Sequence, residues 1–139
     1  MKTDQRILVV DDDDAIRALL QTVLRRRGFR VDSARNGIDA LEQLGARGYA
    51  LVVLDLMMPR MSGYELLDHL GALSMMTRPR VLVLTAGLEP RTFPTDLVIG
   101  TVHKPFDIEL LLDIVSGFLS AGAEQPPAPA DTVELSSPN

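Results

Sequence analysis

Hydrophobic residues along the chain fall into five short runs that are separated by longer amphipathic segments. The runs at 6–10, 50–54 and 80–85 are continuous rather than alternating, which is typical of strands buried on both faces of a parallel sheet. The runs at 30–34 and 98–103 have a similar length but contain more polar residues. We therefore predict five strands, of which the strand at 30–34 has the weakest pattern.

The segments between these runs have the periodicity of helices. Apolar residues recur at helical spacing over 16–24, where Asp13 or Asp14 is placed to cap the helix and Gly28 to end it. Further helices are expected within 36–48, 64–73 and 108–119. Strands and helices thus alternate along most of the chain.

This alternation predicts an α/β fold. We expect a flavodoxin-like three-layer sandwich around a five-stranded parallel sheet in the order 2-1-3-4-5, with right-handed crossovers. Residues 1–122 are expected to form this domain, because a chain of 139 residues has room for one core. Residues 123–139 are rich in proline and carry three acidic but no basic side chains. They are expected to form a disordered tail or a linker.

The composition excludes several classes of function. The chain has no cysteine, which rules out disulfides, thiolate metal sites and cysteine nucleophiles. A formal net charge of −5 argues against a nucleic-acid-binding protein, which would need a basic face. The apolar run near the N-terminus is too short for a signal peptide or a membrane span. We therefore expect a cytoplasmic protein with neither a nucleic acid nor a membrane as its partner.

Five chemically competent side chains lie at the ends of the predicted strands. Asp11 and Asp12 follow the first strand, Asp55 the third, Thr85 closes the fourth and Lys104 follows the fifth. Because parallel strands end at the same edge of a sheet, we expect these side chains to share one crevice. Neighbouring carboxylates repel one another, and a hard cation such as Mg²⁺ relieves that repulsion. Asp11 and Asp12 suit this cation, which leaves Asp55 as a nucleophile for an aspartyl phosphate.

The remaining two side chains meet the other needs of phosphoryl transfer. That reaction depends mainly on positioning and on neutralising the charge of the phosphoryl oxygens. The ammonium group of Lys104 supplies a positive charge, and the hydroxyl group of Thr85 supplies a hydrogen-bond donor. The pattern therefore predicts a site at which Asp55 accepts a phosphoryl group.

Four sequence fragments, ILVVDDD, LDLMMPRMSG, VLVLTA and KPF, follow one another at characteristic spacings. In this respect the chain resembles the receiver domains of two-component response regulators, such as the chemotaxis response regulators, from residue 6 to about residue 120. The resemblance implies that Asp55 accepts a phosphoryl group from a histidine kinase or a phosphotransfer protein. It implies a cis peptide bond between Lys104 and Pro105. It also implies two more roles. Mg²⁺ would be held by Asp11, Asp12, Asp55 and the backbone carbonyl of Met57. The phosphoryl group would be contacted by Thr85 and Lys104.

The sequence departs from the family pattern in two places. Thr101 stands three residues before Lys104, where family members usually carry an aromatic residue that reports phosphorylation. The segment between Thr85 and Lys104 is shorter than usual and contains Pro90 and Pro94. Because proline breaks helix interiors, we expect the fourth helix to be short, distorted or absent.

The last predicted helix, the fifth in the family order, suggests a surface for a partner. Leu110 and Ile114 lie opposite its apolar stripe and are expected to face outward. They indicate a downstream protein partner, or a homodimer, on the face of the fourth and fifth helices. The alternative is that the helix simply has a wide apolar stripe.

These observations favour a response regulator that signals through phosphorylation-dependent partner binding. It would not be an enzyme beyond its own phosphorylation and dephosphorylation. One alternative is a receiver-like scaffold that binds a partner without phosphorylation. A phosphatase of the haloacid dehalogenase type is a weaker alternative, because Asp11 and Asp13 form an Asp-x-Asp pair but the chain lacks room for a substrate cap. No flavin or dinucleotide cofactor is expected, because aspartates stand where a phosphate cradle needs glycines.

Overall fold

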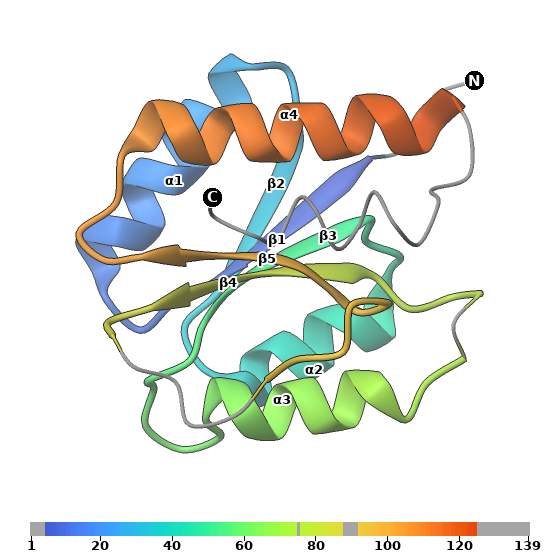
Figure 1. Cartoon of the computed structure of the whole chain (residues 1–139). Coiled ribbons are helices and arrows are strands. Elements are labelled where there is room, and N and C mark those ends of the chain that lie inside the picture. Colours follow the sequence, from blue (N-terminus) through green and yellow to red (C-terminus); the bar gives the residue numbers. More distant parts are fainter. Residues whose placement is uncertain (1–4, 75, 88–91, 125–139) are drawn as a thin grey trace.

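Strands and helices alternate along the described residues of the computed structural model, which are 5–74, 76–87 and 92–124. The five strands form one parallel sheet in the order β2-β1-β3-β4-β5 (Figure 1). The predicted fold class and strand order are therefore confirmed. The bounds of the elements are β1 (Arg6–Val10), α1 (Asp14–Arg26), β2 (Arg30–Ala34), α2 (Gly37–Ala46), β3 (Leu51–Asp55), α3 (Gly63–Gly71), β4 (Arg80–Thr85), β5 (Val98–His103) and α4 (Ile108–Glu124).

Helices cover both faces of the sheet (Figure 1). Because side chains alternate along a strand, Ile7 and Val9 of β1 pack with α1 and α4, whereas Leu8 and Val10 pack with α2 and α3. The central strand β3 is buried along its whole length, as its continuous apolar run predicts. It begins and ends one residue later than expected, so Asp55 is its last residue.

Polar residues set the beginnings of the helices. The carboxylate of Asp13 accepts hydrogen bonds from two amides at the start of α1, and the side-chain oxygen of Asn36 accepts one from the amide of Asp39 at the start of α2. Ser62 starts α3 through a capping box, and Asp107 accepts a hydrogen bond from the amide of Glu109 in α4. Because each helix follows a strand of a parallel sheet, each begins close to the carboxyl edge of the sheet.

The described residues between β4 and β5 are irregular, where we expected a fourth helix that is short, distorted or absent. Residues 86–87 and 92–97 contain no helix, and residues 88–91, which include Pro90, lie outside the described part of the chain. Leu97 is buried and Phe93 packs against the same core, with its ring 6.4 Å from that of Tyr64. Two arginines hold the segment in place. Arg78 forms an ion pair with Asp96, and Arg80 donates hydrogen bonds to the carbonyl groups of Thr95 and Leu97.

The last helix runs to Glu124, so it extends two residues past the predicted domain boundary at 122. The rest of the predicted tail, 125–139, lies outside the described residues. Leu110 is 51% exposed, as expected, whereas Ile114 is partly buried against the core. In the described part of the chain, no helix combines the length and the hydrophobicity that a membrane span requires.

Gly63 allows α3 to begin directly against the end of β3. A Cβ atom at this position would lie 2.6 Å from both the carbonyl oxygen of Asp55 and the Cα atom of Leu56. We expect Gly63→Ala to lower the free energy of unfolding by about 1 to 3 kcal/mol, as overpacking does. Urea denaturation measures this change.

Gly71, in the last turn of the same helix, provides the matched control. A Cβ atom there would have no neighbour within 4 Å. Gly71→Ala should leave stability unchanged or raise it by up to about 1 kcal/mol, because alanine favours the helix. Equal losses in the two variants would contradict a close approach that is specific to Gly63.

Candidate functional site

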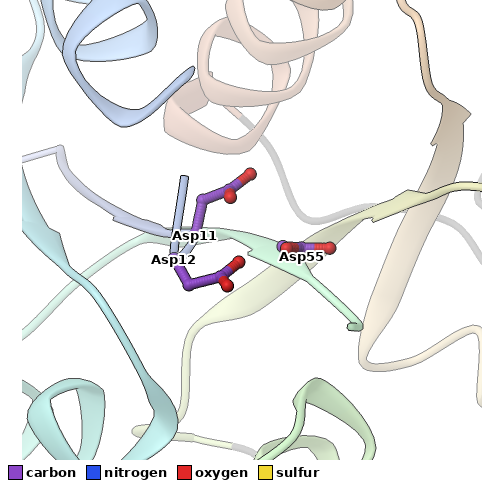
Figure 2. Close-up of side chains that lie close together, drawn as sticks. All are labelled: Asp11, Asp12 and Asp55. Carbon is purple, nitrogen blue, oxygen red and sulfur yellow. The ribbon is translucent and has the colours of Figure 1, made fainter. Parts of the chain in front are cut away.

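Three carboxylates meet where β1 and β3 end. Asp11 and Asp12 follow β1, Asp55 closes β3, and one carboxylate oxygen of each lies within 4.8 Å of the others (Figure 2). The pairing of Val10 with Leu54 places the ends of the two strands side by side. Asp11 and Asp55 are buried, whereas Asp12 is exposed. The cluster therefore has a buried base and one side open to solvent.

The fifth strand brings a positive charge to this cluster. Lys104 Nζ lies 3.4 Å from Asp11 Oδ2 and 3.3 Å from Asp55 Oδ1. Its backbone amide donates to the carbonyl group of Thr85 (2.7 Å), and its peptide bond to Pro105 is cis. Burial would lower the pKa of Lys104, but Asp11 and Asp55 outweigh it and raise that pKa. The ammonium group therefore stays charged beside the carboxylates.

Thr85 and Met57 flank Asp55 on two sides. Asp55 pairs with Leu84 of β4, so Thr85 lies one residue further along the neighbouring strand and is fully buried. The Thr85 hydroxyl accepts a hydrogen bond from the amide of Gly87 (3.3 Å). The backbone amide of Met57 donates to Asp55 Oδ1 (3.1 Å), while the Met57 side chain is 66% exposed. The residues that the sequence analysis assigned to the phosphorylation site thus lie at one edge of the sheet: Asp11, Asp12, Asp55, Met57, Thr85 and Lys104.

The surroundings of Asp55 disfavour its ionised form. Burial raises the pKa of this carboxyl from 3.8 to about 6, and the neighbouring charge of Asp11 adds to the effect. The Met57 amide and Lys104 lower the pKa, but by less. A single ammonium group therefore does not fully compensate the carboxylates.

This donor set fits Mg²⁺. The ion prefers oxygen ligands, is commonly held by one or two carboxylates, and completes its coordination with water or phosphate oxygens. Here Asp11, Asp12 and Asp55 offer three carboxylates within one ion's reach, and the exposed side at Asp12 leaves room for other oxygens. A divalent cation would also offset the charge that Lys104 leaves uncompensated.

Sequence reasoning missed one residue near this site. Arg17, on α1, donates from Nη1 to the carbonyl oxygen of Asp11 (2.9 Å) and from Nη2 to Asp14 Oδ1 (2.6 Å). The signal that could have found it is its position near the start of α1, because a cation there opposes the helix dipole. Thr101, where an aromatic residue was expected, is half-buried on β5 opposite Val83.

Comparison with known proteins gives matches over most of the chain. The family model described as the response regulator receiver domain matches residues 7–116. Protein Rrf1 of Nitratidesulfovibrio vulgaris is 36% identical over 141 residues, which cover 96% of each chain. The transcriptional regulatory protein CpxR homolog of Haemophilus influenzae is 36% identical over 121 residues, which cover 85% of this chain and 52% of that protein. This chain thus spans about half the length of that relative.

A solved structure agrees with these matches. The response regulator protein TrrA of Thermotoga maritima, in complex with Mg²⁺ and BeF, is 33% identical and superposes with a TM-score of 0.71. The similarity covers 81% of this chain and 97% of that one. The matched family region contains the acidic cluster, Thr85 and Lys104. The chain therefore belongs to the response regulator receiver domain family of two-component phosphorelay signalling.

Proposed function

We propose that this protein receives a phosphoryl group on Asp55 from a phosphohistidine of a histidine kinase or phosphotransfer protein. The observation that carries the proposal is the position of Asp55. Its buried carboxylate ends the central strand, 3.3 Å from Lys104 Nζ and within 4.8 Å of the oxygens of Asp11 and Asp12. A carboxylate nucleophile must be held rigidly and must have positive charge close by. The end of the central strand and Lys104 supply these two conditions.

The acidic cluster gives the transfer its dependence on Mg²⁺. Asp11, Asp12 and Asp55 would hold the ion through their carboxylates, and Met57 would add its backbone carbonyl. When bound, Mg²⁺ neutralises charge on the phosphoryl oxygens and so lowers the barrier to attack by an anion. The TrrA structure, which contains Mg²⁺ and BeF, supports this assignment by similarity.

The transfer step exchanges one bond for another at phosphorus. A carboxylate oxygen of Asp55 attacks in line, the new O–P bond forms, and the P–N bond to the donor imidazole breaks. The electron pair of that bond stays on the imidazole nitrogen. The ring leaves as neutral imidazole if its other nitrogen carries a proton, and otherwise the nitrogen that held the phosphoryl group takes up a proton. The Asp55 contacts with Met57 and Lys104 are both made by Oδ1, which favours Oδ2 as the attacking oxygen.

Two side chains hold the transferred group. The Lys104 ammonium pairs with the phosphoryl oxygens in place of the carboxylates that it now contacts. The Thr85 hydroxyl, at the end of β4, donates a hydrogen bond to another of these oxygens. Through these contacts, Lys104 and Thr85 transmit the phosphorylation state of Asp55 to the rest of the fold.

The protein signals by binding a downstream protein in a phosphorylation-dependent manner, and it is not an enzyme acting on a separate substrate. The partner surface includes the exposed Leu110 of α4, where a homodimer would also form. Residues 1–122 serve as the receiver domain and 123–139 as a tail or linker. With Thr101 in place of the aromatic residue, the signal depends on Thr85 and Lys104 rather than on a rotating ring.

Intact-mass spectrometry tests the phosphorylation directly. The protein is incubated with acetyl phosphate, a small phosphodonor, in the presence of Mg²⁺ or of a chelator. A mass gain of one phosphoryl group that requires Mg²⁺ is the expected result. No gain in a folded protein under either condition would contradict the proposal and leave the unphosphorylated scaffold as the function.

A further inference from the structure

Arg17 makes two directed contacts beside the acidic cluster. Its side chain is only 18% exposed, although it belongs to the first turns of a surface helix. One nitrogen donates to the carbonyl oxygen of Asp11 and the other to the carboxylate of Asp14, at 2.9 and 2.6 Å. The guanidinium group therefore bridges the end of β1 and the start of α1.

The helix itself does not favour a cation at this position. Backbone amides at a helix N-terminus carry partial positive charge, which costs an arginine there a few tenths to about 1 kcal/mol. Helical side chains lean toward the N-terminus, so Arg17 reaches back over the loop that precedes α1. Its contacts with Asp11 and Asp14 therefore account for its placement.

The β1–α1 loop is held by a chain of hydrogen bonds that Arg17 closes. The amide of Asp13 donates to Asp11 Oδ1 (2.9 Å), and Asp13 Oδ1 in turn accepts from the amides of Ala15 and Ile16. Arg17 ties the carbonyl of Asp11 to the same helix turn. Asp12 lies between these anchored residues, so its direction depends on them.

We propose that Arg17 is a positioning residue for the Mg²⁺ site, a role that rests on the proposed function. It holds the Asp11–Asp14 loop so that the carboxylates of Asp11 and Asp12 stay close to Asp55. It touches neither the carboxylate of Asp11 nor that of Asp55 in the described contacts, so it acts through the backbone and Asp14. Outer-shell partners of this kind change metal affinity by roughly 10- to 100-fold when they are removed.

The first test compares Mg²⁺ affinity in two arginine variants of the same helix. Arg17→Ala is expected to raise the Kd for Mg²⁺, measured by calorimetry, by about 10-fold or more. Arg25 also donates to a backbone carbonyl, that of Val31 (2.8 Å), at the far end of α1. Arg25→Ala removes the same charge and a similar hydrogen bond, so its Kd should stay within about twofold of wild type. Equal Kd values for the Arg17 variant and wild type, or an equal loss in both variants, would overturn the proposal.

The second test needs no metal. In Mg²⁺-free protein, the Asp13 amide is protected by its bond to Asp11 Oδ1, and NMR-detected hydrogen exchange reports that bond. Arg17→Ala should speed exchange at Asp13 several-fold, while exchange at buried Leu20 of α1 stays unchanged. Unchanged exchange at Asp13 would count against a role in holding the loop.

Two further variants separate the hydrogen bond from the charge, and also serve if the alanine variant folds poorly. Arg17→Gln keeps a donor for the Asp11 carbonyl without charge, and Arg17→Lys keeps the charge without the forked geometry. Positioning predicts that glutamine retains more Mg²⁺ affinity than alanine. Loss of a positive charge beside a cation site would by itself tighten Mg²⁺ binding, so alanine and glutamine variants that both bind Mg²⁺ more tightly than wild type would show an effect of charge, and the proposal would fail.

Failure of this inference can be told apart from failure of the proposed function. A wild-type protein that does not bind Mg²⁺ would contradict the proposed function, whereas the metal-free exchange measurement would still test the loop. A wild-type protein that binds Mg²⁺ just as its Arg17→Ala variant does would contradict this inference alone.

Discussion

Asp55→Asn is expected to abolish the Mg²⁺-dependent phosphoryl gain and, at the same time, to stabilise the metal-free protein at about pH 8. The phosphoryl gain is lost because an amide has no nucleophilic oxygen anion. Stability rises because the ionised carboxylate of Asp55 is unfavourable where it lies, buried and close to Asp11. Asparagine has nearly the same shape and keeps an oxygen for the amide of Met57.

The pH dependence of this gain follows from the pKa of Asp55, which rises from 3.8 to about 6 on folding. The folded protein holds this proton more tightly than the unfolded chain does. The favourable contribution of the protonated group is therefore complete below about pH 4 and is lost as the pH rises through about 6. The advantage of asparagine should reach roughly 2 to 3 kcal/mol above about pH 7 and nearly vanish below about pH 4.

Urea denaturation in the presence of a chelator, at pH values on both sides of this range, measures the difference. Adding Mg²⁺ should stabilise the wild type through binding and so reduce the advantage of Asp55→Asn. A variant that is less stable than wild type at high pH without metal would show that Asp55 is not under electrostatic strain. Phosphorylation that persists in the variant would place the acceptor elsewhere.

Lys104→Met should slow phosphorylation from acetyl phosphate by about 100-fold or more at saturating Mg²⁺, because one preorganised positive charge is lost from the site. The methionine side chain resembles the aliphatic part of lysine in length, so packing changes little. The lost contacts are those of Nζ with Asp11 (3.4 Å) and Asp55 (3.3 Å). The rate of mass gain, followed by intact-mass spectrometry, gives the effect.

Lys104→Arg provides the control for charge. The guanidinium group keeps the positive charge but spreads it over a planar fork, so the rate should fall between those of wild type and Lys104→Met. A methionine variant whose rate stays within threefold of wild type would remove Lys104 from the transfer step. It would leave the acidic cluster and Mg²⁺ to provide all of the charge compensation.

Much of the fold could be predicted because its signals are local. Continuous apolar runs bounded by polar residues mark the strands, and caps such as Asp13 mark the helices. The site follows from the same pattern, because parallel strands with intervening helices must all end at one edge. The pattern therefore predicts that Asp11, Asp55, Thr85 and Lys104 lie close together.

The irregular segment before β5 shows what local signals leave out. Its prolines predict a disrupted helix but not the path of the backbone, which follows from contacts that are distant in sequence. Arg78 reaches Asp96, and Phe93 stacks on Tyr64. Ile114 is a second example. Its spacing along the helix predicts a side chain that faces outward, but packing against the core partly buries it.

The sequence by itself determined the succession of strands and helices along the chain and which chemically competent residues share an edge. Hydrophobic period is a local property, and the intervening helices make successive strands parallel. The tertiary structure decided the electrostatics and the support of that edge. The pKa of Asp55 depends on burial and on Asp11, 44 residues away in sequence, and the contact of Arg17 with the Asp11 carbonyl depends on how α1 leaves the sheet. Such interactions fall off steeply with distance and vary with solvent exposure, so they exist only once the chain is folded.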